Sequence, residues 1–174
     1  SLPERQQLLH IAREAIRLPL TGETNLNVNL GLYPERLREE GASFVTLNLH
    51  GALRGCIGSL EAHRALVLDV AQNAQAAAFK VPRFTPINAE DYQSIDIHIS
   101  ILSAPVALAA DSHQALIDAI EPGIHGLIIE EQGRRATYLP SVWAQIPQPA
   151  RFVAELRKKA GLPANDWHAT TRCF

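Results

Sequence analysis

The segment F-V-T-L-N-L-H-G-A-L-R-G-C-I-G-S-L, residues 44–60, decides the fold. Apolar and polar residues alternate over residues 44–49, as expected for a strand with one buried face. The pair His50-Gly51 marks a tight turn, after which residues 52–60 return as the partner of the first strand. The segment therefore predicts an antiparallel β-hairpin.

A second hairpin with the same outline is predicted further along the chain. The same pattern occurs at residues 41–60 and at residues 123–142. It consists of a glycine, an apolar run, a turn with a polar residue and a glycine, and a second apolar run, and a predicted helix follows each segment. Such internal similarity is typical of related structural units. We therefore predict an α+β fold, with two related hairpin-plus-helix halves around a largely antiparallel, barrel-like sheet.

The remaining regular structure is predicted from periodicity and capping signals. The capping-box pair Ser1 and Glu4 begins an amphipathic helix that ends near Pro19. Strict alternation predicts a strand over residues 95–102. Residues 19–43 are rich in glycine, asparagine and proline, and we expect a long connection there, with or without a function of its own. Further helices are predicted for residues 61–79, for 111–120 with Asp111 as the cap, and for 149–161.

The composition is that of one globular domain spanning residues 1–174. With 174 residues, of which 47% are hydrophobic and 20% charged, the chain can bury a full-sized core. Its 16 basic and 18 acidic side chains leave a net charge of -2, which argues against nucleic-acid binding, because neutralising phosphates requires a basic surface. The sequence contains no apolar run of membrane-spanning length, so we expect no membrane association.

The cysteines and histidines show no metal-binding pattern. Cys56 and Cys173 are far apart and form no CxxC or Cys/His cluster, and the seven histidines lack ligand spacing. We therefore predict neither a disulfide framework nor a metal site. Free thiols are typical of a reducing compartment, so we expect a cytoplasmic protein.

Cys56 is the candidate nucleophile. On a regular strand Arg54 and Cys56 share one face, because side chains alternate. A guanidinium beside a thiol favours the thiolate, which is the form that attacks an electrophile. The alternative is that Cys56 only packs in the core, since free cysteine is among the most buried residue types. The residues alone leave both interpretations open.

Arg83 is a candidate for holding an anion. It lies in P-R-F-T-P, residues 82–86, where two prolines stiffen the backbone and present Arg83 beside Phe84. The alternative is an ion pair with a surface carboxylate. On the last predicted helix we expect one basic face, formed by Arg151, Arg157, Lys158 and Lys159. Such a face is usually solvated and only occasionally a partner site.

Five short motifs follow one another in a characteristic order. They are L-R-G-C-I-G at 53–58, P-R-F-x-P at 82–86, H-G-L-I-I at 125–129, A-T-Y-L-P-x-V at 136–142 and R-K-K-A-G-L at 157–162. Together they resemble the AMMECR domain family, whose bacterial members are also called AmmeMemoRadiSam system protein A. The resemblance runs from about Leu8 to Cys173 and implies an α+β fold of two related halves around a barrel-like antiparallel sheet.

The resemblance also implies the residues of a site. Carried over position by position, Arg54 and Cys56 match the signature hexapeptide, and Arg83 matches the family's R-F element. His125 matches its H-G turn, and Tyr138 its Y-L-P element. We expect Cys56 and His125 to be catalytic and Arg54, Arg83 and Tyr138 to bind substrate.

The resemblance implies that the protein acts in the same pathway as two other proteins. Bacterial members of the family are associated with a Memo-like protein and a radical SAM protein, which are the expected partners; no cofactor or oligomeric state is implied. We expect a small-molecule or peptide-modifying enzyme, or an enzyme subunit, with its site at the L-R-G-C-I-G strand. The alternative is a noncatalytic adaptor that binds the same partners. An open Cys56 thiol favours the enzyme, and a fully packed one favours the adaptor.

Overall fold

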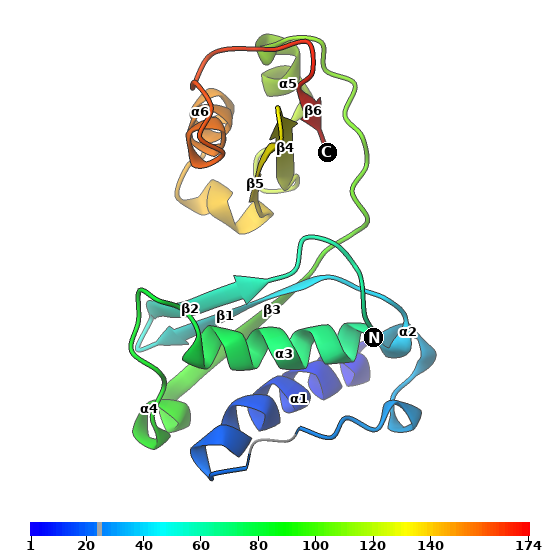
Figure 1. Ribbon diagram of the computed structural model, residues 1–174, viewed down its shortest axis with the longest axis vertical. Coiled ribbons are helices and arrows are strands. Elements are labelled where there is room, and N and C mark those ends of the chain that lie inside the picture. Colours follow the sequence, from blue (N-terminus) through cyan, green and yellow to red (C-terminus); the bar gives the residue numbers. More distant parts are fainter. Residues whose placement is uncertain (24–25) are drawn as a thin grey trace. The chain divides into compact units, whose positions relative to one another are not determined.

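The computed structural model describes residues 1–23 and 26–174, which form two compact units, Ser1–Ala104 and Pro105–Phe174 (Figure 1). Positions 24 and 25 of the predicted long connection lie outside the described residues. Each unit combines helices with an antiparallel sheet, so the α+β class is confirmed. The single domain expected over residues 1–174 stays a prediction.

The expected barrel-like sheet is wrong. Within the described residues the strands form two separate sheets of three strands each, and neither closes into a barrel. Each hairpin gains a single further strand, so both sheets keep two edges. Alternation along a strand shows which residues share a face, and it carries no information on how many strands a sheet contains.

The first unit packs helices against one face of a sheet with strand order β2-β1-β3. Figure 1 shows α1 and α3 side by side along this sheet. Val45 and Leu47 of the central strand are fully buried together with Val70 of α3 and Ile16 of α1. The elements of this unit are α1 (Leu2–Leu20), η1 (Leu30–Leu32), α2 (Glu35–Arg38), β1 (Ser43–Leu49), β2 (Ala52–Gly58), α3 (Leu66–Phe79), α4 (Ala89–Ser94) and β3 (Ile95–Ile101).

The second unit has a sheet with strand order β5-β4-β6. In its core the rings of Trp143 and Phe152 are stacked, with centroids 3.7 Å apart. Ser112 caps its first helix in place of the expected Asp111, because the Ser112 hydroxyl accepts a hydrogen bond from the Ala115 N–H at 3.2 Å. Its elements are α5 (His113–Ala119), β4 (Leu127–Glu131), β5 (Arg134–Tyr138), η2 (Pro140–Ala144), α6 (Pro149–Lys159) and β6 (Arg172–Cys173). In the described parts of both units, no helix is long and apolar enough to cross a bilayer.

Both predicted hairpins are confirmed, and they share one turn geometry. β1 pairs antiparallel with β2, and β4 pairs antiparallel with β5. The two turn residues have positive φ in each case, 52° and 79° at His50 and Gly51, and 51° and 77° at Gln132 and Gly133. Positive φ at both positions matches the right-handed twist of the flanking strands.

Gly55 sets the distance between the first hairpin and α3. It pairs with Leu47 on the buried face of the sheet, and a Cβ atom at this position would lie 2.1 Å from the carbonyl oxygen of Ala77. Only glycine therefore lets the helix backbone lie so close to the strand. At Gly58 a Cβ atom would lie 2.2 Å from Cγ of Phe44, whose ring covers this position. Packing thus explains two glycines of the L-R-G-C-I-G motif.

The buried carboxylate of Asp69 joins α3 to the start of β1 and to the residue that follows β2. Oδ2 of Asp69 accepts hydrogen bonds from the backbone N–H and the hydroxyl of Ser43 at 2.8 and 2.7 Å, and from Nδ2 of Asn73 at 2.9 Å. Its Oδ1 accepts from the hydroxyl of Ser59 at 2.6 Å and from Nε of Arg64 at 2.8 Å. Ser43 begins β1 and Ser59 follows β2, so the network holds the open end of the hairpin against the helix.

Arg157 is buried in the second unit, which corrects the expectation that it belongs to a solvated basic face. Its Nη2 donates to Oε2 of Glu131 at 3.1 Å, and its Nε donates to the carbonyl of Pro163 at 2.8 Å. Oε2 of Glu131 also accepts from the Thr171 hydroxyl at 2.5 Å. The pair therefore joins α6, β4 and the C-terminal segment. Arg157 lies four residues after Val153 and therefore belongs to the apolar stripe of the helix. This spacing predicts that Arg157 is buried, whereas the run of basic residues at 157–159 suggests exposure to solvent.

We predict that Gly55→Ala lowers the free energy of unfolding by about 3 kcal/mol, because the new methyl group forces α3 away from β2. Denaturant unfolding of the variant and the wild type measures this change. Leu53→Ala on the same strand is the control, since Leu53 is 44% exposed and its truncation should change stability little. A loss below about 1 kcal/mol for Gly55→Ala would show that the close approach is not required.

The Asp69 network gives a second stability prediction. Asp69→Asn keeps the side-chain shape, removes the charge facing Arg64 and turns an NH2 group toward hydrogen-bond donors. The expected loss is about 3–5 kcal/mol in the free energy of unfolding. Asp118→Asn, at an exposed aspartate that accepts from Gln114, is the matched control and should have almost no effect. Equal effects of the two substitutions would contradict a structural role for the buried carboxylate.

Candidate functional site

Cys56 lies on the face of the first sheet that points away from α3. Thr46 of the central strand pairs with Cys56 on one side and with His98 on the other. Because side chains alternate, Thr46 faces away from the core that contains Val45 and Leu47. Cys56 is half-buried, and its Sγ accepts a hydrogen bond from the Thr46 hydroxyl at 3.3 Å. The thiol is thus neither fully packed nor fully open.

A β-bulge removes Arg54 from the regular alternation. Leu47 pairs with Gly55, whereas the next residue of β1, Asn48, pairs with Leu53, so Arg54 has no partner on β1. An extra residue of this kind bends the strand and redirects its side chain. The side-chain alternation predicted for residues 52–60 therefore breaks at Arg54.

The Arg54 guanidinium is held by the segment that follows α3. Its Nη2 donates to Oγ1 of Thr85 at 3.0 Å and to Oδ2 of Asp91 at 3.4 Å. Among the described residues, no hydrogen bond joins Arg54 to Cys56. The arginine that was expected to flank the thiol is therefore engaged with a carboxylate and a hydroxyl instead.

The ring of Phe84 brings two of the predicted substrate-binding side chains together. Cζ of Arg83 lies 4.9 Å from the ring centroid, and Cζ of Arg54 lies 5.8 Å from it. Both distances are within the range of cation–π attraction. Arg83 is exposed, and its side chain makes no hydrogen bond or ion pair within the part of the chain that the structure describes. We call these three side chains the Arg54–Phe84–Arg83 cluster.

Local structure explains how the partners of Arg54 are placed. The Phe84 N–H donates to the Val81 carbonyl at 3.1 Å, which closes the turn after α3. Asn88 then caps α4, accepting from the Asp91 N–H at 2.8 Å, while Asp91 reaches back to the Asn88 N–H at 3.5 Å. Asp91 was not among the sequence candidates. The N-x-x-D spacing at residues 88–91 is the capping signal that predicts its position.

His125 lies in the second unit, where it closes a turn. Its Nδ1 accepts from the backbone N–H of Glu121 at 3.1 Å, and its own backbone N–H donates to the Glu121 carbonyl at 3.1 Å. Its carbonyl accepts from Nε1 of Trp143 at 2.7 Å. An accepting Nδ1 carries no proton, so the proton of the neutral ring is on Nε2. These contacts explain the H-G motif structurally, and the catalytic role of His125 stays a prediction.

Tyr138 packs at the edge of the second core. Its ring meets that of Phe152 edge to face, with centroids 5.2 Å apart, and Nζ of Lys159 lies 5.1 Å from its centroid. Burial raises the pKa of the Tyr138 phenol, and the nearby carboxylate of Glu155 adds to this shift. A Cβ atom at Gly126 would lie 3.0 Å from the Tyr138 carbonyl oxygen, so the H-G and Y-L-P motifs pack directly against each other.

The five candidate residues are divided between the two units. Arg54, Cys56 and Arg83 belong to Ser1–Ala104, whereas His125 and Tyr138 belong to Pro105–Phe174. The geometry of the first unit brings Arg54 and Arg83 together on one ring. Across the described residues, no group of three or more His, Cys, Asp or Glu side chains is arranged to hold a metal ion.

Comparison with known proteins identifies relatives along almost the whole chain. A protein of Methanothermobacter thermautotrophicus is 37% identical over 164 residues, which cover 94% of this chain and 85% of that protein. Protein MJ0810 of Methanocaldococcus jannaschii is 33% identical over 172 residues, which cover 97% of this chain and 84% of that protein. The crystal structure of uncharacterized protein PH0010 from Pyrococcus horikoshii matches with a TM-score of 0.87 at 30% identity, covering 95% of this chain and 84% of that one.

The family model for AMMECR1 matches residues 9–174. This range contains all five motifs and both structural units almost entirely. The resemblance inferred from the motifs is confirmed, and the chain belongs to the AMMECR1 family.

Proposed function

We propose that this protein is an enzyme, or an enzyme subunit, that acts on a small molecule or peptide carrying an anionic group. The observation that supports this most strongly is the Arg54–Phe84–Arg83 cluster, in which two guanidinium groups lie against one aromatic ring. Arginine pairs bidentately with carboxylate and phosphate groups, and a second arginine nearby strengthens such binding.

The charge balance of the cluster fits an anionic ligand. Asp91 lies 3.4 Å from Nη2 of Arg54 and offsets part of its charge, whereas Arg83 has no carboxylate partner among the described residues. Arg54 is held in place by two hydrogen bonds, and Arg83 is exposed and free to close on a ligand. The cluster therefore combines one preorganised donor group with one adjustable donor group.

Cys56 is the proposed nucleophile, and it lies on the same strand as Arg54. It is half-buried, and the Thr46 hydroxyl donates to its Sγ and orients the sulfur. In the proposed step the Cys56 thiolate attacks an electrophilic carbon of the bound substrate and displaces a leaving group, which departs as an anion or takes a proton from water. The catalytic role of His125 and the substrate-binding role of Tyr138 stay predictions, and the contacts described for both residues lie within their own unit.

The proposed setting follows from the family resemblance. We propose that the protein acts in the cytoplasm, in a pathway that includes a Memo-like protein and a radical SAM protein. The alternative is a noncatalytic adaptor that binds these partners through the sheet face around Cys56. On that face the exposed His98 and the half-buried Thr46 and Cys56 form one row across three strands. If the thiol is unreactive, we assign this row of accessible polar side chains to partner binding.

Thiol reactivity distinguishes the two proposals. We predict that iodoacetamide modifies Cys56 of the folded protein at pH 7 and leaves Cys173 unmodified. Cys173 is 4% exposed, and burial raises its pKa to about 11, so only about one molecule in ten thousand carries this thiolate at pH 7. Because the shift is upward, labelling of Cys173 in the folded protein should become appreciable only as the pH rises toward 11.

Peptide mass spectrometry after timed labelling measures this order. Cys56→Ser should abolish labelling at pH 7, and unfolding in guanidinium chloride should expose Cys173 as the positive control. Labelling of Cys173 before Cys56, or of neither thiol, would exclude Cys56 as a nucleophile and favour the adaptor.

Anion binding is the second test. We expect titration calorimetry to detect binding of inorganic phosphate or acetate to the wild type. Arg83→Ala should weaken this binding at least about tenfold, because a charged hydrogen bond contributes about 1.5–3 kcal/mol. Its melting temperature should stay that of the wild type, since the Arg83 side chain is exposed and unpaired within the described residues.

Arg54→Ala should weaken binding similarly and also lower the melting temperature, since it removes the contacts with Thr85 and Asp91. Arg5→Ala, at an exposed arginine on α1, is the control and should change neither property. Wild-type affinity in Arg83→Ala, or no anion binding by the wild type, would overturn the proposed role of the cluster.

A further inference from the structure

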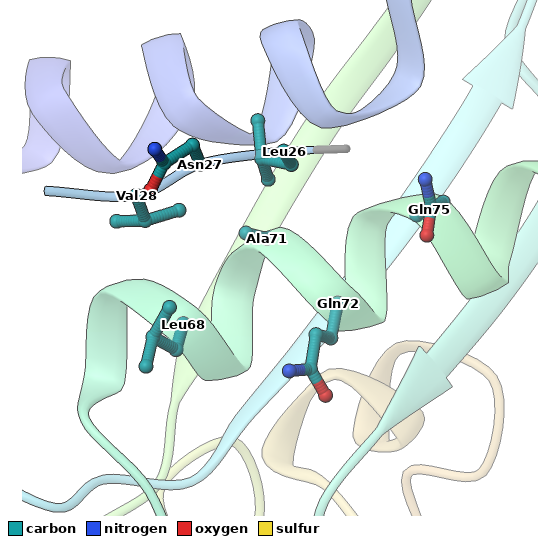
Figure 2. A pocket seen from close by; sticks show the side chains of 7 residues that line it. All are labelled: Leu26, Asn27, Val28, Leu68, Ala71, Gln72 and Gln75. Atoms are coloured by element: carbon teal, nitrogen blue, oxygen red, sulfur yellow. The ribbon is translucent and has the colours of Figure 1, made fainter. Parts of the chain in front are cut away.

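A cavity of about 530 Å³ lies in the first unit between α3 and the extended segment at residues 26–28. Figure 2 shows the side chains that line it, four from α3 and three from the facing segment. They are Leu26, Asn27, Val28, Leu68, Ala71, Gln72 and Gln75. None of these residues belongs to the Arg54–Phe84–Arg83 cluster or contacts Cys56, so the function proposed above leaves the cavity unassigned.

The apolar part of the lining is suited to the faces of a flat ligand. Leu68 and Ala71 lie on α3, and Leu26 and Val28 approach from the facing segment (Figure 2). These residues belong to or border the first hydrophobic core, which gives the cavity a firm floor. A volume of this size is typical of sites for small organic ligands.

The polar part of the lining consists of three carboxamides. Gln72 and Gln75 lie three residues apart on α3 and therefore on neighbouring turns of one face, and Asn27 lies on the facing segment. Oε1 of Gln72 accepts a hydrogen bond from Nη1 of Arg64, which leaves its NH2 group available to donate. Within the described residues, the side chains of Gln75 and Asn27 make no hydrogen bond, so each offers both a donor and an acceptor.

None of the seven lining residues that the structure describes is ionisable, and the guanidinium that is hydrogen-bonded to Gln72 is already balanced. Arg64, which holds Gln72, donates from Nε to the buried carboxylate of Asp69 at 2.8 Å. A carboxylate or ammonium ion that packs against the apolar part of the lining would gain no counter-charge from the described residues around it. This lining therefore selects against charged ligands and favours an uncharged one.

We propose that this cavity binds an uncharged planar amide, either an aromatic carboxamide or a lactam ring. The donor and acceptor of a carboxamide match the acceptor and donor of another amide edge, and two parallel hydrogen bonds can form between them. Gln75 supplies this edge on the α3 side, Gln72 adds a donor of fixed orientation, and Asn27 supplies a second edge across the cavity. The leucine, valine and alanine side chains cover the ring faces.

Benzamide and benzoate test this inference, because they share their shape and differ in charge. In titrations of the full chain followed by ¹⁵N NMR, benzamide should shift the side-chain NH2 resonances of Asn27, Gln72 and Gln75 with one saturation curve. Benzoate should leave these resonances unshifted. Gln75→Leu keeps the apolar stem and should weaken benzamide binding about tenfold. Gln93→Leu, at an exposed glutamine on α4, is the matched control and should bind benzamide like the wild type.

Asn27→Leu provides a second variant on the facing segment and should weaken binding by a similar factor. Thermal melts of the variants confirm that each one is folded before its affinity is compared. Absence of saturable benzamide binding, equal binding of benzoate, or wild-type affinity in both lining variants would each overturn the inference. None of these outcomes bears on phosphate binding at Arg83, so the two proposals fail independently.

Discussion

The close approach of α3 to β2 at Gly55 is the constraint on which the first unit depends. A helix backbone can lie against this strand only because the position has no Cβ atom, and α3 ends two residues after the contact at Ala77. The chain that leaves the helix therefore begins close to β2 and carries Phe84 and Thr85 to the Arg54 side chain. The glycine of the signature thus determines where the arginine beside it finds its partners.

Packing explains much of the family signature, and this narrows the residues left for function. Gly55 and Gly58 are required by α3 and by Phe44, and the H-G and Y-L-P motifs meet in the second unit, where Gly126 lies against the Tyr138 carbonyl. Arg83 differs from these residues, since its side chain is exposed, lies over the Phe84 ring and makes no hydrogen bond or ion pair among the described residues. An exposed loop arginine of the signature whose polar atoms have no partner in the described structure is a strong candidate for binding a ligand.

The hairpins, the main helices and the third strand could be predicted because each depends on local periodicity and turn chemistry. The bulge at Arg54 could not, since it depends on the hydrogen-bond register between two strands. The burial of Arg157 was missed because a run of basic residues concealed its place on the apolar stripe of α6. Arg54 and Arg83 could be proposed from their motifs, and their role in substrate binding stays a prediction, whereas the Phe84 ring that both guanidinium groups contact and the capping role of Asp91 depend on the tertiary structure.

The most direct test of the proposed anion site observes the guanidinium groups themselves. Arginine Nε–Hε resonances of the full chain should be followed by NMR while inorganic phosphate is added at constant ionic strength. We expect the Arg54 and Arg83 resonances to shift together along one saturation curve, whereas the resonance of the exposed Arg5 should stay in place. Equal, unsaturable shifts at all exposed arginines, or no shift at Arg83, would contradict the proposed anion site.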